Sequence, residues 1–131
     1  FLLLTKNPIR YFEFLNKMPE NVILGATIET DRDDLYIRHH ISRAPLPTER
    51  LEAMRGIKWP KKMVSIEPIL RFSNDFADKI IEIEPELVYI GYDNYNNRLP
   101  EPSIKETIDL IDTLRNSGIH VRIKTLRQVL I

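Results

Sequence analysis

The sequence has no cysteine among its 131 residues, and this absence excludes several kinds of chemistry from these residues. A chain without thiols forms no disulfide, has no thiolate nucleophile, and supplies no cysteine ligand to zinc or to an iron–sulfur cluster. The absence is compatible with a reducing cytoplasm, which is the location that we expect. Nineteen Lys and Arg residues balance nineteen Asp and Glu residues, so the net charge of zero indicates no bulk attraction to nucleic acid or membranes.

Long hydrophobic runs are also missing. No apolar run approaches the roughly 20 residues that a membrane helix requires, so no membrane partner is predicted. The FLLL stretch at residues 1–4 is too short for a signal peptide and has no basic region before it. Because the sequence opens in this strand-like run without an initiating methionine, we expect it to be part of a longer protein. Its length and 43% hydrophobic content fit a single domain over residues 1–131.

Five short hydrophobic runs dominate the residues that are present, and each begins apolar and ends polar. They are FLLLTKN, VILGATIET, MVSIEPIL, LVYIGYDN and HVRIKT. A helix signal follows each run, and strands that alternate with helices predict a parallel sheet. We therefore predict an α/β fold in which about five parallel βα units form a partial TIM-like barrel. Neither a G-x-G-x-x-G nor a P-loop motif is present, so the nucleotide-binding versions of an open sheet have no support.

Turn and capping signals place these elements along the chain. Strands are expected at about residues 1–6, 22–29, 62–67, 87–93 and 120–125. Helices are expected to begin at Asn7, Thr48, Ser73 and Ser103, with a further helix beginning within residues 127–131. The charged connection over residues 30–47 is expected to be a loop, and the basic run KWPKK at residues 58–62 a solvated surface. In the helix after Ser103, the predicted apolar stripe is Ile104, Ile108, Ile111 and Leu114.

Strand side chains alternate between the two faces of a sheet, and one face here is aliphatic while the other is small or charged. The second face carries Gly25, Thr27 and Glu29 in one strand and Ser65 and Glu67 in the next. The two later strands place Gly91 with Asp93, and Arg122 with Lys124, on the same face. Because the carboxyl ends of parallel strands gather at one rim, we expect a polar site there. Its ionisable residues are Glu29, Glu67, Asp93 and Lys124.

This pattern leaves several functions open. The charges can form salt bridges that close the end of a barrel, or they can serve acid–base chemistry in a lyase or hydrolase that uses Glu29, Glu67 and Lys124. The three carboxylates can also hold a divalent cation, but no spacing supports this, and no metal site is predicted. A non-catalytic domain that contacts protein or nucleic acid is a further alternative, with the polar loop around Tyr95 and Arg98 as a candidate contact.

Four phrases occur in a fixed order along the chain. They are LLTKNP at residues 3–8, PENVILGATIE at 19–29, VSIEPIL at 64–70 and VYIG at 88–91. Together they resemble a phage-associated family of radical-SAM-like TIM-barrel proteins of unknown function, and they are distantly similar to the spore photoproduct lyase branch of radical SAM enzymes. The resemblance spans most of the chain and implies that it is the C-terminal part of such a barrel.

The resemblance also implies cofactors. The family holds a [4Fe–4S] cluster through a cysteine triad and binds S-adenosylmethionine across the strand ends. Those cysteines are absent here, so either a missing N-terminal portion carries them or the chain is a degenerate relative, and without them the chain is inactive in this chemistry. The resemblance implies that the cofactor contacts are Thr27, Glu29 and Ser65.

The remaining site residues and the partners follow from the same resemblance and from the geometry of a partial barrel. The resemblance implies that Glu67 and Asp93 contact cofactor or substrate, and that Lys124 binds a carboxylate or phosphate, so these three are the predicted catalytic residues. Five units leave two sheet edges unpaired, and we expect the missing N-terminal portion or a partner chain to cover them.

Overall fold

The computed structural model describes residues 1–126, and this part of the chain contains five strands, four α-helices and two 3₁₀-helices. The strands are β1 (Leu2–Thr5), β2 (Ile23–Thr27), β3 (Lys62–Ile66), β4 (Leu87–Gly91) and β5 (His120–Thr125). The α-helices are α1 (Asp33–His39), α2 (Pro47–Gly56), α3 (Phe76–Ile83) and α4 (Ile104–Asn116). The 3₁₀-helices are η1 (Pro8–Glu13) and η2 (Leu15–Lys17). The helix expected to begin within residues 127–131 lies outside the described residues.

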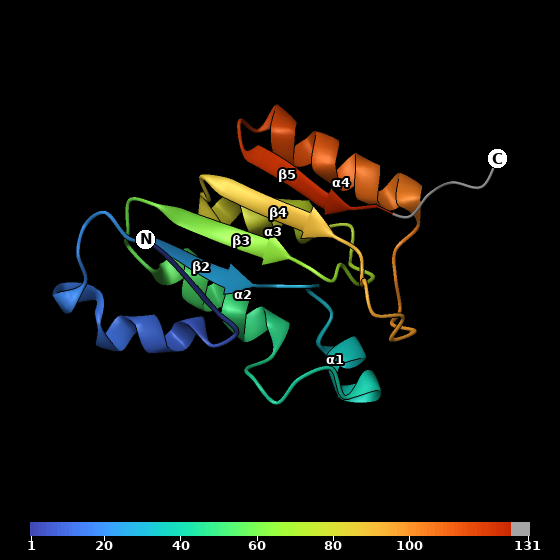
Figure 1. The fold of residues 1–131 in the computed structure, drawn as a ribbon, viewed down its shortest axis with the longest axis horizontal. Helices are drawn as coiled ribbons and strands as arrows, with labels where there is room; N and C mark the ends of the chain where they lie inside the picture. The colour runs from blue at the N-terminus through green and yellow to red at the C-terminus, as the bar shows by residue number, and fades with distance from the viewer. Residues whose placement is uncertain (127–131) are drawn as a thin grey trace.

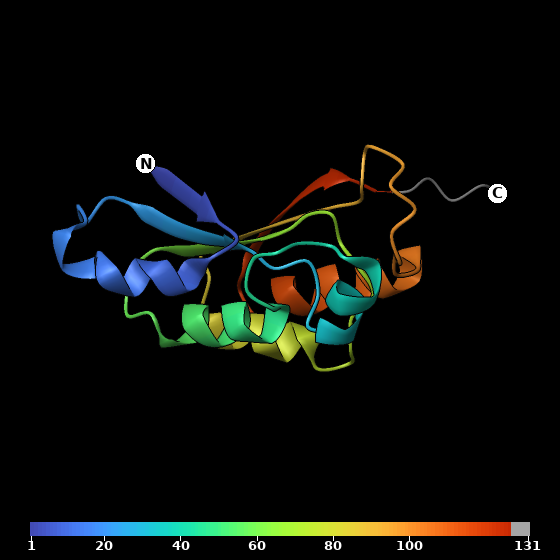
Figure 2. The same ribbon diagram turned by 90° about the horizontal axis from the view of Figure 1, so that it is seen from below.

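The strands form one sheet in the order β1-β2-β3-β4-β5, and every neighbouring pair is parallel (Figure 1). This confirms the predicted α/β fold of repeated βα units. The helices lie together on one side of the sheet, and the other side is left open (Figure 2). β1 and β5 are at opposite ends of the strand order, so the sheet is an open arc, as expected for part of a TIM-like barrel.

The hydrophobic core lies between the sheet and the helices. Alternate residues of the central strands enter it, including Leu24 and Ala26 of β2 and Val64 and Ile66 of β3. The helices contribute mainly through Met54, Phe76, Ile80, Ile83 and Leu114. The predicted aliphatic face is therefore the face that the helices cover, because burying it removes the largest apolar area from water.

The segment after β1 departs from the prediction of an α-helix, because it forms η1 and η2 instead. Pro8 is at the first helical position as expected, but the Asn7 side chain makes no capping hydrogen bond. The Tyr11 hydroxyl donates to the carbonyl oxygen of Gly25 at 2.7 Å and lies 3.0 Å from that of Leu3. These contacts hold the segment against the sheet, so tertiary anchoring outweighs helix propensity here.

The prediction of a loop over residues 30–47 is wrong in part, because α1 lies within it. Asp33 and Asp34 are in its first turn and Arg38 and His39 in its last, which complements the helix dipole. The helix is only 7 residues long, and Tyr36 is one of its two buried residues. So short an apolar stripe gives too weak a periodic signal to separate a helix from a charged loop.

Of the predicted capping residues, only Ser103 is confirmed. Its Oγ accepts from the Glu106 amide at 3.1 Å, and the Glu106 carboxylate accepts from the Ser103 amide at 3.1 Å. α2 starts one residue before Thr48, whose amide donates to Asp33 at 3.0 Å. The N-cap of α3 is Asp75, and the Ser73 hydroxyl donates to Asp31 instead.

The buried stripe of α4 is rotated relative to the prediction. Its buried residues are Thr107, Leu110, Ile111 and Leu114. Ile108, predicted to be in the stripe, is 44% exposed. The apolar residues alone suggested a different face because Thr107, although polar, is buried, and its hydroxyl pairs with that of Tyr92 at 2.7 Å.

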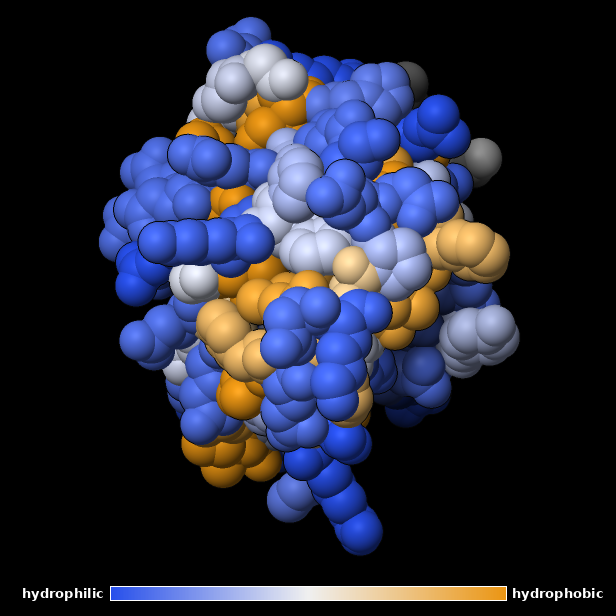
Figure 3. Space-filling model, turned by 90° about the vertical axis from the view of Figure 1, so that its left-hand side faces the viewer, coloured by the Kyte–Doolittle hydropathy of each residue, from blue (hydrophilic) through white to orange (hydrophobic). Residues whose placement is uncertain are grey.

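The end of the sheet at which the strands begin is largely hydrophilic, with hydrophobic groups between the polar ones (Figure 3). The KWPKK run lies at this end, but it is not wholly solvated as predicted. Lys62 is buried, and its ammonium donates to the carbonyl oxygens of Met54 and Ile57, both at 2.9 Å. The indole N–H of Trp59 donates to the carbonyl of Val22 at 2.7 Å. Within residues 1–126, none of the helices combines the length and hydrophobicity needed to cross a bilayer.

Candidate functional site

The open face of the sheet carries rows of side chains that the strand register brings side by side. Thr27 pairs with Ser65, Ser65 with Tyr89, and Tyr89 with Arg122. These four residues therefore form one polar row across β2 to β5. Thr27 and Ser65, both predicted cofactor contacts, are adjacent in this row, and both are largely buried.

Glu67 and Lys124 meet in the next row toward the carboxyl ends of the strands. The Lys124 ammonium is 3.7 Å from Oε1 of Glu67 and 5.1 Å from the centroid of the Tyr89 ring. A Cβ placed on Gly91 would be 2.6 Å from Oε2 of Glu67 and 3.4 Å from Cβ of Lys124. The Glu67 carboxylate therefore occupies the space that a side chain at Gly91 would fill. The contact between Glu67 and Lys124 agrees with the sequence-based prediction that these two residues lie together.

The second oxygen of Glu67 is not fully used. Oε2 is shielded from solvent and has no hydrogen-bond partner among the described residues, although the side chain as a whole is 28% exposed. The contact of Oε1 with Lys124 is an ion pair that is longer than a hydrogen bond. An unsatisfied buried acceptor costs roughly 1–3 kcal/mol, so the carboxylate would gain by turning this oxygen toward a donor on a molecule bound at the open face.

Asp93 follows the end of β4 and organises the loop that comes after it. Its carboxylate accepts from the amides of Tyr95 at 3.1 Å and Asn97 at 2.7 Å, and from the Asn97 side-chain nitrogen at 3.1 Å. A hollow of about 490 Å³ opens beside this loop. Its lining residues are Asp93, Asn94, Asn96, Arg98, Leu99 and Glu101. The structure therefore places Asp93 at the base of a loop near the rim.

Glu29 lies apart from the open-face pair, so the expectation that it shares one rim with Glu67 and Lys124 is wrong. Its side chain is 1% exposed, and Oε1 accepts from Nη1 of Arg50 at 3.0 Å. Its Oε2 accepts from the hydroxyl of Tyr36. β2 ends at Thr27, so strand alternation no longer governs the direction of Glu29, whose partners belong to α1 and α2.

Arg50 connects this buried cluster to the backbone. Nη1 also donates to the carbonyl of Thr27 at 2.9 Å, and Nε donates to that of Pro45 at 2.7 Å. The guanidinium lies 4.9 Å from the centroid of the Tyr36 ring, and Nη2 is buried without a hydrogen-bond partner in the described part of the chain. Burial, followed by the negative charge of Glu29, raises the pKa of Tyr36 well above its ordinary value.

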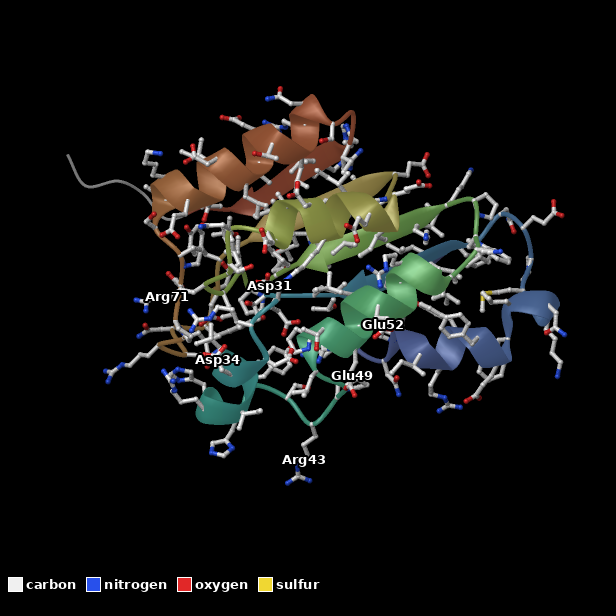
Figure 4. All side chains as sticks on the ribbon, turned by 180° about the vertical axis from the view of Figure 1, so that it is seen from behind. Asp31, Asp34, Arg43, Glu49, Glu52 and Arg71 are labelled. Carbon is white, nitrogen blue, oxygen red and sulfur yellow. The ribbon has the colours of Figure 1, made fainter. Side chains whose placement is uncertain are left out.

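Asp31 forms a second tie between the end of β2 and α3. Its carboxylate accepts from the Ser73 amide and the Lys79 ammonium, both at 2.9 Å, and from the Ser73 hydroxyl. Figure 4 shows Asp31 at the end of the sheet where the strands finish. Burial disfavours the charged carboxylate, but the hydrogen bonds from Ser73 and Lys79 outweigh this cost and lower the pKa of Asp31.

Sequence reasoning missed Arg50, Tyr36 and Tyr89. Arg50 shares the buried face of α2 with Met54, four residues later, and a charged residue within an apolar stripe is a signal for a buried ion pair. Tyr89 has the same strand parity as Gly91, which placed it on the open face. Among residues 1–126, no group of three or more His, Asp or Glu side chains is arranged to hold a metal ion.

Comparison with known proteins gives one informative likeness. No protein-family model matches the sequence, and no curated protein matches it significantly. The structure is similar to the crystal structure of a radical SAM methyltransferase from Sphaerobacter thermophilus, with a TM-score of 0.59 and 17% sequence identity. The alignment covers 97% of this chain and 40% of the methyltransferase. This likeness shows a shared fold. The chain spans less than half the length of that neighbour.

Proposed function

We propose that this chain forms the C-terminal part of a radical-SAM-type barrel and that its open face binds S-adenosylmethionine. The shared fold supports the first part of the proposal. The second part rests on the open face, where polar side chains from successive strands line the row below Glu67 and Lys124. Active sites of such barrels lie at the carboxyl ends of the strands, where this pair lies.

The observation that carries the proposal is the shielded Oε2 of Glu67, which has no hydrogen-bond partner in the described part of the chain. S-adenosylmethionine has ribose hydroxyls and an α-ammonium group that can donate to this oxygen once the carboxylate, whose side chain is 28% exposed, turns toward the open face. Its α-carboxylate can pair with Lys124, whose side chain is 52% exposed. The hydroxyls of Thr27 and Ser65 in the adjacent row can bond the polar groups that remain.

The iron–sulfur cluster of radical SAM enzymes does not fit this chain. No cysteine is present in its 131 residues, so its own side chains supply no thiolate ligands to a cluster. We therefore derive no step through a cluster. A further portion of the polypeptide or a partner chain would have to hold it, and we propose that the same portion covers the edge of β1, where Leu2 and Leu4 are about half exposed.

The structure does not bring together the residues that the alternative of a lyase or hydrolase requires. It requires Glu29, Glu67 and Lys124 together, but the carboxylate of Glu29 is enclosed by Arg50 and Tyr36. The kinship to a phage-associated family and to spore photoproduct lyase, the catalytic role of Asp93 and a cytoplasmic location remain predictions.

Isothermal titration of the chain with S-adenosylhomocysteine, a stable analogue, tests the proposal. We expect binding that Glu67→Gln and Lys124→Ala each weaken at least fivefold. Glu82→Gln is the matched control, because Glu82 forms an exposed ion pair with Arg55 at 3.1 Å in the helix layer. No binding by the unmodified chain, or equal affinity in all variants, would refute the proposal.

A further inference from the structure

We infer that the open face also receives a single-stranded nucleic acid, with phosphates lying along β5 and a base stacked on Tyr95. This inference deepens the proposed function, because it names the class of substrate presented to the same face. Apart from Lys124, which the two proposals share, it is carried by side chains that the proposed S-adenosylmethionine site does not use. Three features support it, namely a basic row on β5, an exposed aromatic ring in the loop after β4, and a hollow that other residues of this loop line.

The basic row consists of His120, Arg122 and Lys124, at alternate positions of β5. All three are exposed, whereas Val121 between them is buried in the core. Alternate residues of a strand are about 6.6 Å apart, a spacing comparable to that of successive phosphates in an extended strand of nucleic acid. Arg122 has no ion pair within residues 1–126, and its one side-chain hydrogen bond is to His120 at 3.4 Å. Its charge is therefore available to an anion.

The aromatic ring is that of Tyr95, which is 85% exposed. Its loop leaves the end of β4 and rises on the side of the sheet opposite the helices (Figure 2). The Asp93 carboxylate holds the loop through the Tyr95 and Asn97 amides. Asn96 and Arg98 both have a φ of 54°, a left-handed conformation that is uncommon outside glycine and often marks functional sites.

The hollow beside the loop, which Asn94 and Asn96 line on either side of Tyr95, gives the nucleotide next to the stacked base a place to lie. Its volume is about 490 Å³, and Arg98 lines it without an ion pair in the described part of the chain. Basic groups that follow a backbone, together with aromatic rings on which bases stack, are the recurring elements of sites for single strands. A duplex keeps its bases within the stack and out of reach of Tyr95, so the geometry favours a single strand over a duplex.

The charge balance limits the strength of this binding. The chain as a whole is neutral, and Glu67 offsets part of the charge of Lys124. Attraction is therefore local to β5 and the Tyr95 loop, and it will weaken as salt screens the phosphates. Modest affinity with a small salt dependence is expected, equivalent to about two phosphate contacts.

Fluorescence anisotropy with a labelled dT12 oligonucleotide at low salt tests the inference. We expect Tyr95→Ala to weaken binding about tenfold and Tyr95→Phe to retain it, because stacking requires only the ring. Arg122→Ala should reduce the slope of log affinity against log salt by about one. Arg43→Ala is the matched control, because Arg43 projects from the loop before α2, away from the sheet (Figure 4), and should bind like the unmodified chain.

Several outcomes would overturn the inference. They are no binding of dT12, equal binding of a duplex or of polyglutamate, or an equal loss in Arg43→Ala. Circular dichroism of each variant separates lost binding from lost folding. The proposed function fails independently. Binding of dT12 without S-adenosylhomocysteine would refute only the proposed function, and the reverse result would refute only the nucleic-acid inference.

Discussion

On each face of the sheet, a carboxylate that follows a strand pairs with a cation, and these two pairs differ in distance and in burial. On the helix-covered face, Glu29 and Arg50 are 3.0 Å apart and almost fully buried. On the open face, Glu67 and Lys124 are 3.7 Å apart, and Lys124 is half exposed. Each pair leaves one shielded atom without a hydrogen-bond partner among residues 1–126, namely Nη2 of Arg50 and Oε2 of Glu67. The first pair joins the end of β2 to α1 and α2, whereas the second lies on the face that the helices leave open.

The contrast between Glu29 and Glu67 shows that a carboxylate placed just after a strand can be either part of a buried ion pair or part of a candidate binding site. Glu29 and Glu67 are the last residues of two similar runs, LGATIE and VSIE. β2 ends two residues before Glu29, and the chain then directs this side chain to the helices. β3 ends at Ile66, immediately before Glu67, whose side chain keeps the direction that strand alternation predicts. Glu29 is therefore one residue farther from the end of its strand than Glu67 is, and this difference accompanies the change from a buried ion pair to a candidate binding site.

The largest effect is expected from breaking the buried pair with Arg50→Met. Removing the cation leaves Glu29 charged and enclosed, and losses of about 3–5 kcal/mol are typical of such changes. Urea unfolding monitored by circular dichroism measures the difference. Arg55→Met, which removes an exposed ion pair to Glu82, should cost less than about 1 kcal/mol. Equal losses in the two variants would contradict this account of the helix-covered face.

A second pair of variants tests which side of α4 faces the core. Leu114→Ala should destabilise the chain by about 2–5 kcal/mol, because Leu114 is fully buried and its loss leaves a cavity. Ile108→Ala should change the free energy of unfolding by less than about 1 kcal/mol, because that side chain is 44% exposed. The same urea titration measures both free energies of unfolding. A larger loss of stability in Ile108→Ala than in Leu114→Ala would support the buried stripe that was predicted from the sequence.

Gly91→Ala tests whether the position of the Glu67 carboxylate on the open face matters for binding. The new Cβ would lie 2.6 Å from Oε2 of Glu67, so the carboxylate must move away from Lys124. We expect affinity for S-adenosylhomocysteine to fall about tenfold by titration calorimetry, a change of about 1.4 kcal/mol. In Gly56→Ala the nearest atom is 3.6 Å away, in the ring of Phe12, and affinity should stay the same. An unchanged affinity in Gly91→Ala would remove Glu67 from the proposed site.

The smallest effect concerns pH and the Asp31 tie. Its lowered pKa means that its stabilisation is present above the unfolded carboxyl's pKa of about 4 and is lost as the pH falls through the folded value. Asp31→Asn should therefore cost about 1 kcal/mol at pH 7, reduced by the solvent exposure of Lys79, and the cost should shrink in acid. Thermal unfolding between pH 2 and 7 gives the comparison, and a loss that is independent of pH would contradict it.

The alternation of hydrophobic runs with helix signals was enough to predict the fold, because strand alternation and helix periodicity are local properties of the chain. Of the four predicted capping residues, only Ser103 was correct. These local signals also predicted that Glu67 and Lys124 meet, since both have strand parity that holds to the rim. What they did not predict depends on tertiary contacts. The Tyr11 hydroxyl anchors η1 through a distant carbonyl, and Arg50 crosses from α2 to pair with Glu29. Such long-range partners leave no periodic trace in the sequence.

The enclosed ammonium of Lys62 has a chemical consequence. Burial lowers the pKa of this amine, and its protons are donated to carbonyls at the end of α2. Acylating reagents attack accessible, unprotonated amines, so the lack of access should dominate, and Lys62 should be modified more slowly than Lys58 or Lys61. Peptide mass spectrometry after brief treatment with an N-hydroxysuccinimide ester would then report on the integrity of the last turn of α2. Rapid labelling of Lys62 would mean that this turn opens readily in solution.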